Sequence, residues 1–318
     1  MRCQTNLLLL CVTTLALGGC VGVSEDISRP TPARHWPTLM AHRGGTGDAP
    51  ENTLPAIATA LSNGAEALWL TVQLSRDGVP VLYRPADLSA LTNGQGKVAD
   101  HTLAELQQLN AGWQFKQADG AGGFSYPWRE RSLPIPTLID ALNAIPPAIP
   151  VVLDMKALPA APQAAAVAHV LDGARAWQRV TLYSTEAAYQ QAFAPYRQAQ
   201  LYESRDATRL RLAQVDLAAQ CNAPVVGTRA AFEISRKVDL VETFTLGEGR
   251  SSVNARLWTP AAVQCFRQQG KVYLTAIAVN NVDDLKAATC LGMDAVLVDS
   301  PATLRPLRDS LKLPLACR

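Results

Sequence analysis

From residue 38 to the end of the chain, short runs rich in β-branched and aliphatic residues alternate with segments of helical periodicity. Such alternation favours a parallel sheet whose strands are connected by crossover helices. We expect strands at 38–42, 67–74, 79–83, 151–155, 180–183, 200–202, 224–227, 272–277 and 295–298. Eight or nine strands are enough to close a barrel, so the sequence predicts one α/β domain, a (β/α)8 TIM-type barrel over residues 38–318. An open doubly wound sheet is the alternative.

The composition agrees with a folded domain and excludes several other classes. Hydrophobic residues make up 48% of the 318 residues and charged residues 18%, which excludes coiled-coil, collagen-like and disordered chains. The net charge is +2, so the chain has no general field for nucleic acid, and we expect no nucleic-acid partner. No G-x-G-x-x-G or GxxxxGK[ST] motif follows the first predicted strand, so a nucleotide cofactor has no support.

The N-terminus has the pattern of an export signal. Residues 7–17 form an apolar run of 11 residues, which is too short to span a bilayer core about 30 Å thick but fits a signal-peptide core. Small residues then precede Cys20, an arrangement that resembles a bacterial lipobox. We expect residues 1–19 to be a lipoprotein signal peptide and residues 20–37 to be the lipidated Cys20 with a tether to the membrane. An ordinary secretory signal with an incidental Cys20 is the alternative.

The predicted compartment follows from the residues around this cysteine. Val21 stands where an aspartate would indicate inner-membrane retention. By resemblance to that sorting rule, we expect a bacterial cell-envelope protein anchored in the outer membrane and facing the periplasm. Cys3 and Cys11 would leave with the predicted signal peptide and Cys20 would be lipidated, so four of the seven cysteines remain. Export permits disulfides among these four, with three possible connectivities. We favour the pairs Cys221–Cys265 and Cys290–Cys317, and four buried thiols are the alternative.

Residues 111–133 interrupt the alternation of strands and helices. This segment places Gly120, Gly122 and Gly123 among five aromatic residues. Long loops of this kind often carry function. We therefore expect either a mobile lid or substrate clamp, or an apolar flap packed on the rim of the barrel.

Several short motifs resemble those of the glycerophosphodiester phosphodiesterase family, along almost the whole mature chain. They are Ala41-His42-Arg43-Gly44, Pro50-Glu51-Asn52-Thr53-Leu54, Leu153-Asp154-Met155-Lys156, and Val298-Asp299-Ser300-Pro301 near the end. The resemblance implies a barrel of the PLC-like phosphodiesterase superfamily. It also implies hydrolysis of glycerol-phospho-alcohols to glycerol 3-phosphate and an alcohol. The family uses two acid/base histidines and a divalent metal held by a Glu-x-Asp pair and a later Glu.

Three functional positions of that family are intact in this chain. Residue by residue, the resemblance assigns acid/base chemistry to His42 and phosphate binding to Arg43 and Lys156. A phosphodiester transition state gathers negative charge on its oxygens, so cations stabilise it while a positioned group moves protons. The resemblance therefore implies a small phosphodiester or phosphomonoester as the partner.

The metal site is where the sequence departs from the family. Trp69 and Thr71 occupy the positions of the Glu-x-Asp pair, and Asp154 replaces the later Glu. Hard cations prefer several oxygen ligands, including carboxylates. We therefore expect no tightly bound cofactor, with weak Ca²⁺ or Mg²⁺ binding at Asp154 as the most that remains. Arg84 occupies the position of the second histidine and adds positive charge for phosphate binding.

Two functional hypotheses follow. In the first, the protein binds a phosphate group but has weak or absent metal-dependent turnover. In the second, it is an active, metal-independent phosphodiesterase that uses His42, with Arg84 replacing the cation and Glu203 or Tyr83 as the second proton carrier. Structural roles are the alternatives for single residues. His42 would then be a packing residue bonded to Glu51, Arg84 a solvated rim charge, and Asp154 and Lys156 a structural ion pair.

Overall fold

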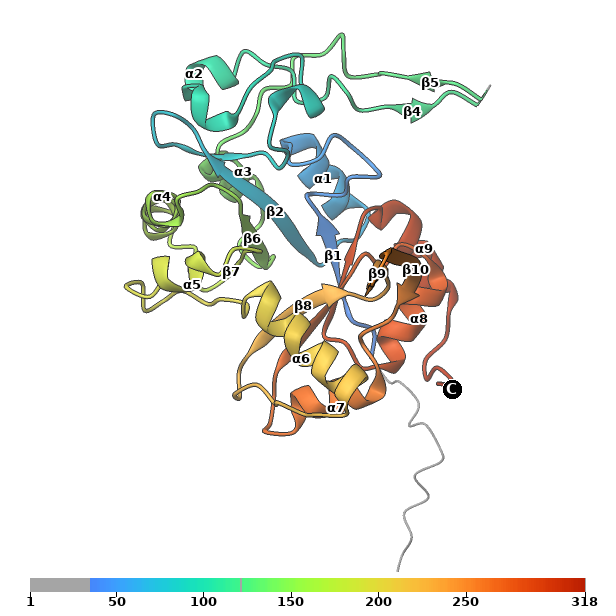
Figure 1. Ribbon diagram of the computed structural model, residues 1–318. Helices are drawn as coiled ribbons and strands as arrows, with labels where there is room; N and C mark the ends of the chain where they lie inside the picture. Colours follow the sequence, from blue (N-terminus) through green and yellow to red (C-terminus); the bar gives the residue numbers. More distant parts are fainter. Residues whose placement is uncertain (1–34, 121, 318) are drawn as a thin grey trace, which may run out of the picture.

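A curled sheet of parallel strands forms the centre of the molecule, in the order β7-β6-β2-β1-β12-β11-β8 (Figure 1). The structure is a computed structural model that describes residues 35–120 and 122–317. The predicted signal peptide and Cys20 therefore lie outside the described residues. The strands of this sheet are β1 (Thr38–His42), β2 (Ala67–Leu74), β6 (Val151–Met155), β7 (Val180–Tyr183), β8 (Arg229–Glu233), β11 (Tyr273–Ile277) and β12 (Ala295–Val298).

The remaining wall of the barrel is a short extended segment between β7 and β8. Leu201 forms a parallel bridge with Leu182 of β7, and Tyr202 forms one with Arg229 of β8. This segment fills the eighth position and joins the two ends of the sheet. The predicted (β/α)8 TIM-type barrel is therefore confirmed, and the sheet is not the open doubly wound alternative.

Two predicted barrel strands need correction. The strand expected at 79–83 is β3 (Pro80–Leu82), which pairs with β2 in antiparallel orientation and lies outside the barrel. The strand expected at 224–227 is wrong, because β8 begins only at Arg229. Val225 and Val226 are 71% and 63% exposed. They lie in the loop before β8, so their apolar character does not mark a core strand.

Helices cover the outside of the barrel and bury one face on the sheet (Figure 1). In α1, the Thr53 hydroxyl accepts a hydrogen bond from the Ala56 amide and caps the helix, while Ile57 and Ala60 are buried. Capping and an apolar face together explain why this segment is helical. The outer helices are α1 (Leu54–Ser62), α3 (Leu138–Ala144), α4 (Ala160–Gly173), α5 (Ala188–Ala192), α6 (Arg205–Ala218), α7 (Pro260–Arg267), α8 (Val282–Cys290) and α9 (Pro301–Ser310).

Two antiparallel hairpins project from the barrel (Figure 1). The longer one, β9 (Arg236–Phe244) and β10 (Gly247–Ala255), directly follows β8. The shorter one, β4 (Gln117–Ala118) and β5 (Phe124–Ser125), belongs to the insertion between β3 and α3. That insertion also holds α2 (Leu103–Leu106) and two 3-10 turns, Leu88–Ala90 and Val98–Asp100.

The aromatic segment 111–133 is anchored at its base and exposed at its tip. Ala111 and Leu133 are buried in a small core beside β3, and Trp128 packs against it. Phe124 and Tyr126 are exposed. The base is thus the predicted packed flap, whereas a role of the tip as a lid or clamp stays a prediction.

Both favoured disulfides are present. Cys221 bonds to Cys265, and Cys290 bonds to Cys317. The first ties the segment after α6 to α7, and the second ties the C-terminus to α8. Within 35–120 and 122–317, no helix is both long and apolar enough to cross a membrane.

Candidate active site

A cavity of about 260 Å³ lies at the C-terminal end of the barrel strands. His42, Tyr183, Glu233 and Ile277 each end a strand and contribute to its wall. Side chains at this end of a TIM barrel are the usual source of active-site groups. The lining residues are His42, Trp69, Arg84, Asp154, Lys156, Tyr183, Thr185, Arg205, Glu233, Ile277 and Leu297.

His42 is held by a carboxylate from the other end of the chain. Its Nδ1 lies 2.6 Å from Oδ1 of Asp299, and Asn280 Nδ2 donates to the second oxygen, Oδ2, at 2.6 Å. The hydrogen bond from His42 is the main cause that lowers the pKa of Asp299. A carboxylate at Nδ1 favours the tautomer with the proton there, which leaves Nε2 to face a ligand. The expected bond from His42 to Glu51 is wrong, because Asp299 takes that place.

Arg43 is positioned by the motif that follows it. Its backbone is left-handed, with φ of 52°, and its Nη1 donates to Oε2 of Glu51 at 2.8 Å. Asn52 fixes this loop, since its amide donates to the Arg43 carbonyl and its Oδ1 accepts from the Thr71 amide. Gly44 has φ of +81°, and a Cβ there would lie 3.2 Å from Ala56 Cβ. Arg43 is not among the lining residues of the cavity, but its guanidinium is near enough to Asp154 to oppose the rise that burial causes in the pKa of that carboxyl.

Asp154 and Lys156 form an ion pair in the wall of the cavity. Lys156 Nζ lies 3.1 Å from Oδ1 of Asp154, and it donates to the Thr185 hydroxyl at 3.2 Å. Burial raises the pKa of Asp154, and the nearby Lys156 ammonium opposes this rise. Asp154 and Lys156 therefore form the ion pair that was one prediction for them. They also line the cavity, where the other prediction, ligand binding, would place them.

Trp69 and Thr71 lie on β2 beside Asp154. Trp69 is 2% exposed, and its ring centroid lies 4.7 Å from that of Tyr183 and 5.8 Å from that of Tyr202. Thr71 stands opposite Asp154 in the register of β2 and β6. The Thr71 hydroxyl is buried without a hydrogen-bond partner. An aromatic cluster and a neutral hydroxyl therefore lie on the β2 side of the Asp154 carboxylate, which pairs with Lys156.

The sequence analysis missed a second ion pair of the cavity. Arg205 Nη2 lies 2.6 Å from both carboxylate oxygens of Glu233, and the guanidinium stands 4.5 Å from the centre of the Phe232 ring. A strand predicted at 229–233 instead of 224–227 would have identified Glu233, because this residue is the last of β8. Arg84 is exposed, and no carboxylate of the described residues lies within 4.0 Å of its guanidinium.

The two expected second proton carriers lie outside the cavity. Glu203 accepts from Arg211 Nε at 3.1 Å and from the Thr208 hydroxyl at 2.9 Å. Tyr83 is buried in the insertion, where its hydroxyl donates to the Leu88 carbonyl and burial raises its pKa. Both predictions are wrong, because each side chain turns away from the barrel mouth to satisfy a local partner.

Comparison with known proteins identifies the family. The profile of the Glycerophosphoryl diester phosphodiesterase family matches residues 42–303. The chain belongs to this family. The matched range begins at His42 and extends past Asp299, so it includes every residue of the cavity described above.

A relative from Mycobacterium tuberculosis resembles the chain over most of its length. An uncharacterized protein of Mycobacterium tuberculosis is 46% identical over 295 residues, which cover 92% of this chain and 96% of the relative. The crystal structure of that protein's glycerophosphoryl diester phosphodiesterase domain matches with a TM-score of 0.79 and covers 86% of this chain and 100% of the domain.

More distant relatives support the fold and a local motif. A phosphodiesterase of Oleispira antarctica, in complex with the product sn-glycerol-3-phosphate, has a TM-score of 0.61 at 23% identity and covers 86% of this chain and 98% of its own. This likeness shows the fold. Human glycerophosphodiester phosphodiesterase 1 is 44% identical over 73 residues, which are 23% of this chain and 22% of the human protein.

Proposed function

We propose that this family member is an envelope lipoprotein whose cavity binds the phosphate group of a glycerol phosphodiester or phosphomonoester, with weak or absent metal-dependent turnover. The observation that carries the proposal is the composition of the cavity wall. Lys156 and Arg84 offer cationic donors to an anion, while both carboxylates of the wall, Asp154 and Glu233, already pair with cations. Trp69 and Thr71 stand beside Asp154 on β2.

The donors at this mouth do not fit a tightly bound divalent metal. Ca²⁺ and Mg²⁺ prefer six or more oxygens, usually with two or more carboxylates. Here Asp154 is already paired with Lys156 at 3.1 Å, and the indole of Trp69 supplies no oxygen. In the described ranges, no group of three or more His, Cys, Asp or Glu side chains is arranged to hold a metal ion. Asp154 alone is the site we propose for weak Ca²⁺ or Mg²⁺ binding.

Phosphate binding is supported by the charges of the cavity. Arg84 has no carboxylate partner among the residues described, so its guanidinium is available for charge-assisted hydrogen bonds to phosphate oxygens. Lys156, which also lines the cavity, adds a second donor. Arg43 pairs with Glu51 and acts on the nearby Asp154, and we propose it as a further phosphate-binding cation.

A metal-independent phosphodiesterase is the second candidate function, and the His42–Asp299 pair favours it. Asp299 holds His42 through Nδ1, so Nε2 is left to accept a proton from a nucleophile. Arg84 would offset the charge that develops on the phosphate oxygens in place of a cation. This function needs the ring of His42 and the guanidinium of Arg84 in the same cavity, which both line.

The lipid anchor is a separate part of the proposal. Leu17-Gly18-Gly19-Cys20 resembles a lipobox, and Val21 favours sorting to the outer membrane, facing the periplasm. Mass spectrometry of the mature chain tests this directly. An acylated Cys20 as the first residue supports the anchor, whereas an unmodified Cys20 contradicts it.

Ligand binding is tested with the full chain and glycerol 3-phosphate. At 100 times the dissociation constant, the ligand should stabilise the fold by about 2.7 kcal/mol, which raises the melting temperature. We expect Arg84→Ala to weaken binding about tenfold, because one charge-assisted hydrogen bond is lost. Arg76→Ala is the matched control, since this exposed arginine pairs with Glu105 away from the cavity. No stabilisation of the wild type would contradict phosphate binding.

Turnover of glycerophosphocholine and glycerophosphoethanolamine separates the two functions. The first function predicts little or no hydrolysis with Ca²⁺ or Mg²⁺. Hydrolysis that EDTA abolishes and that His42→Ala removes would refute it. Hydrolysis that is insensitive to EDTA, and that both His42→Ala and Arg84→Ala remove, would support the metal-independent enzyme.

A further inference from the structure

The end of the barrel opposite the cavity carries an arc of cations without carboxylate partners. In a parallel barrel, the loops that precede the strands all lie at this end. We use the name basic rim for Arg175, Arg197, Arg229 and Lys271, which precede or begin β7, the segment at Leu201, β8 and β11. Within the part of the chain described, none of the four lies within 4.0 Å of a carboxylate.

The basic rim is continuous because these strands are neighbours in the barrel wall. Arg229 Nη2 donates to Oε1 of Gln200 at 3.3 Å. Gln200 and Arg175 in turn line one surface hollow. On the other side, the Gly227 amide donates to the Lys271 carbonyl at 2.8 Å. Arg175 and Arg229 are thus linked through Gln200, and Arg197 and Lys271 stand in the neighbouring loops at the same end, so the positive charges of these four residues reinforce one another there.

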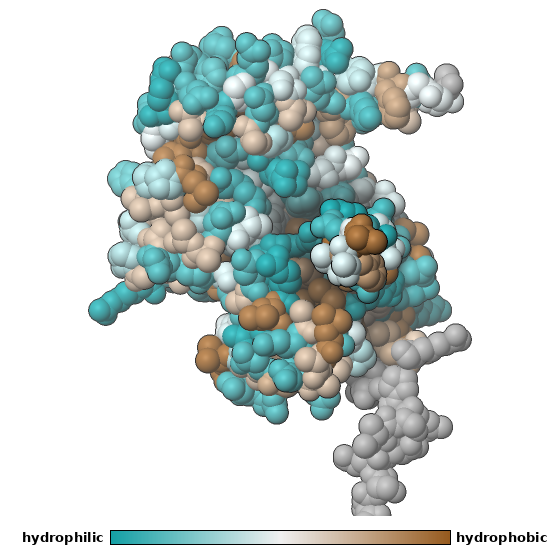
Figure 2. Space-filling model, viewed as in Figure 1, coloured by the Kyte–Doolittle hydropathy of each residue, from teal (hydrophilic) through white to brown (hydrophobic). Residues whose placement is uncertain are grey.

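Exposed aliphatic side chains lie within the same end. Leu217, at the end of α6, is 84% exposed, and Val225 and Val226 in the following loop are 71% and 63% exposed. Figure 2 shows apolar side chains gathered over α6. Adjacent large apolar side chains in one exposed loop mark an interaction surface more often than chance exposure.

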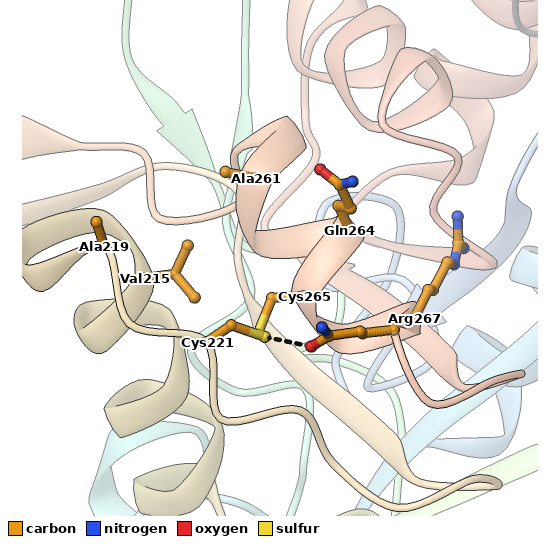
Figure 3. Close-up of a pocket in the computed structure, with 8 residues that line it drawn as sticks. Val215, Ala219, Cys221, Ala261, Gln264, Cys265 and Arg267 are labelled. Atoms are coloured by element: carbon orange, nitrogen blue, oxygen red, sulfur yellow. Dashed lines mark hydrogen bonds between the residues drawn. A yellow bond between two sulfur atoms is a disulfide. The ribbon is translucent and has the colours of Figure 1, made fainter.

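A hollow beside this loop is lined by apolar side chains together with Gln264, Arg267 and Gln268 (Figure 3). It measures about 520 Å³, and Val215, Ala219 and Ala261 line it between α6 and α7. The Cys221–Cys265 disulfide fixes the loop to α7 at its edge. The loop that presents Val225 and Val226 is therefore held against the helix layer.

We propose that this end of the barrel docks on an anionic lipid bilayer. The basic rim would lie on the phosphate layer, with Leu217, Val225 and Val226 in the interface beneath it. Each Lys or Arg near an anionic membrane strengthens binding roughly fivefold, and aliphatic side chains add to this. A polynucleotide would use the cations but leave the aliphatic side chains without a partner, so the combination favours lipid.

The course of the chain supports this orientation. β1 begins at Thr38 at the docking end, so the described structure is entered there. The proposed anchor Cys20 precedes His35 by only 15 residues. The inference rests on the proposed anchor for delivery to the membrane, and it is independent of phosphate binding. Docking in this orientation points the cavity away from the lipid.

Tryptophan quenching by brominated acyl chains tests the orientation. The full chain carrying Val226→Trp is mixed with vesicles of brominated phosphatidylcholine and phosphatidylglycerol. Leu246→Trp is the matched control, because this 99% exposed leucine lies at the tip of the β9–β10 hairpin, which is rooted at the opposite end. We expect quenching at position 226 at least threefold stronger than at position 246. Equal or stronger quenching at position 246, or none at position 226, would overturn the proposal.

Charge variants test the cause of docking in the same assay. With Val226→Trp present, Arg175→Gln, Arg197→Gln and Lys271→Gln together should reduce quenching at least tenfold. The control combines Arg76→Gln, Arg209→Gln and Arg250→Gln, exposed arginines that each contact a carboxylate. Quenching that persists on purely zwitterionic vesicles, or that a DNA duplex abolishes, would refute the anionic bilayer as the partner. Mass spectrometry of Cys20 in the same samples separates a failed anchor from a failed surface.

Discussion

The two ends of the barrel carry similar basic side chains in opposite states of pairing. Of the basic residues that line the cavity in the described structure, His42, Lys156 and Arg205 contact carboxylates at 2.6, 3.1 and 2.6 Å. Arg84 is the exception there. At the other end, the four cations of the basic rim contact no carboxylate of residues 35–120 and 122–317 within 4.0 Å.

This difference separates recognition of one small anion from attraction to a charged surface. Internal carboxylates compete with an incoming phosphate, so the cavity favours a ligand that matches its geometry. Exposed, unpaired cations cost little desolvation and build a field that acts beyond contact distance. The net charge of +2 over 318 residues therefore does not distinguish the paired cations of the cavity from the unpaired cations of the basic rim.

The largest predicted effect lies at the docking end, where the Cys221–Cys265 disulfide closes a separation of 44 residues. Replacing both cysteines by serine should lower the free energy of unfolding by about 4 kcal/mol, because the unfolded chain regains loop entropy. Urea denaturation measures this. The Cys290–Cys317 pair, with a separation of 27, is the control, and its loss should cost about 3.5 kcal/mol. A loss below about 1 kcal/mol for the first pair would show that this end is held by packing alone.

The next effect lies at the cavity. Lys156→Met leaves the buried Asp154 carboxylate without its partner, so the free energy of unfolding at pH 7 should fall by about 3 kcal/mol. Burial raises the pKa of Asp154, so the folded state takes up a proton more readily than the unfolded chain. The loss should therefore shrink as the pH falls. Lys116→Met, which removes an exposed lysine, is the control, and an equal loss for both variants would contradict the ion pair.

A smaller effect is predicted for Asp299→Asn. The pKa of Asp299 is lowered from 3.8, mainly by the hydrogen bond from His42, so its stabilisation is present above that value and disappears as the pH falls through the folded pKa. We expect a difference from wild type of about 1 kcal/mol or less near pH 6, because the pair is partly exposed. Thermal denaturation from pH 6 to pH 2 measures it. A difference that does not depend on pH would exclude this electrostatic cause.

The smallest effect is expected at the basic rim. Arg175→Gln removes an exposed charge without a carboxylate partner, so the free energy of unfolding should change by less than about 0.5 kcal/mol. The same denaturation experiment checks this value. A larger loss would mean that the rim cations hold the fold together, and the contrast between the two ends would be lost.

Much of the fold was predictable because the periodicity of the chain reports local structure. The two misplaced strands show the limit of this signal. Val225 and Val226 have the apolar character of a core strand but lie exposed in a loop, and β8 begins with Arg229. Burial depends on the rest of the barrel, which a local window of sequence does not contain.

The site was predictable where a motif carries it and unpredictable where distant segments meet. His42, Arg84, Asp154 and Lys156 were expected at one mouth, and they line one cavity. Asp299 lies in a recognised motif, but its bond to His42 spans 257 residues. Sequence gave no direct sign of this contact, because only closure of the barrel brings β1 beside β12. The Arg205–Glu233 pair was missed for the same reason.

The short wall at Leu201 and Tyr202 has a mechanical consequence. The backbone hydrogen bonds across it run from Leu182 to the Gln200 carbonyl, from Tyr202 to the Leu182 carbonyl and from Glu203 to the Arg229 carbonyl. β2 and β6, by contrast, share five register pairs. Among the eight positions of the barrel wall, this short segment lies directly opposite β1. Because single bridges hold this segment to β7 and β8, we expect local opening of the barrel wall to begin there rather than between β2 and β6.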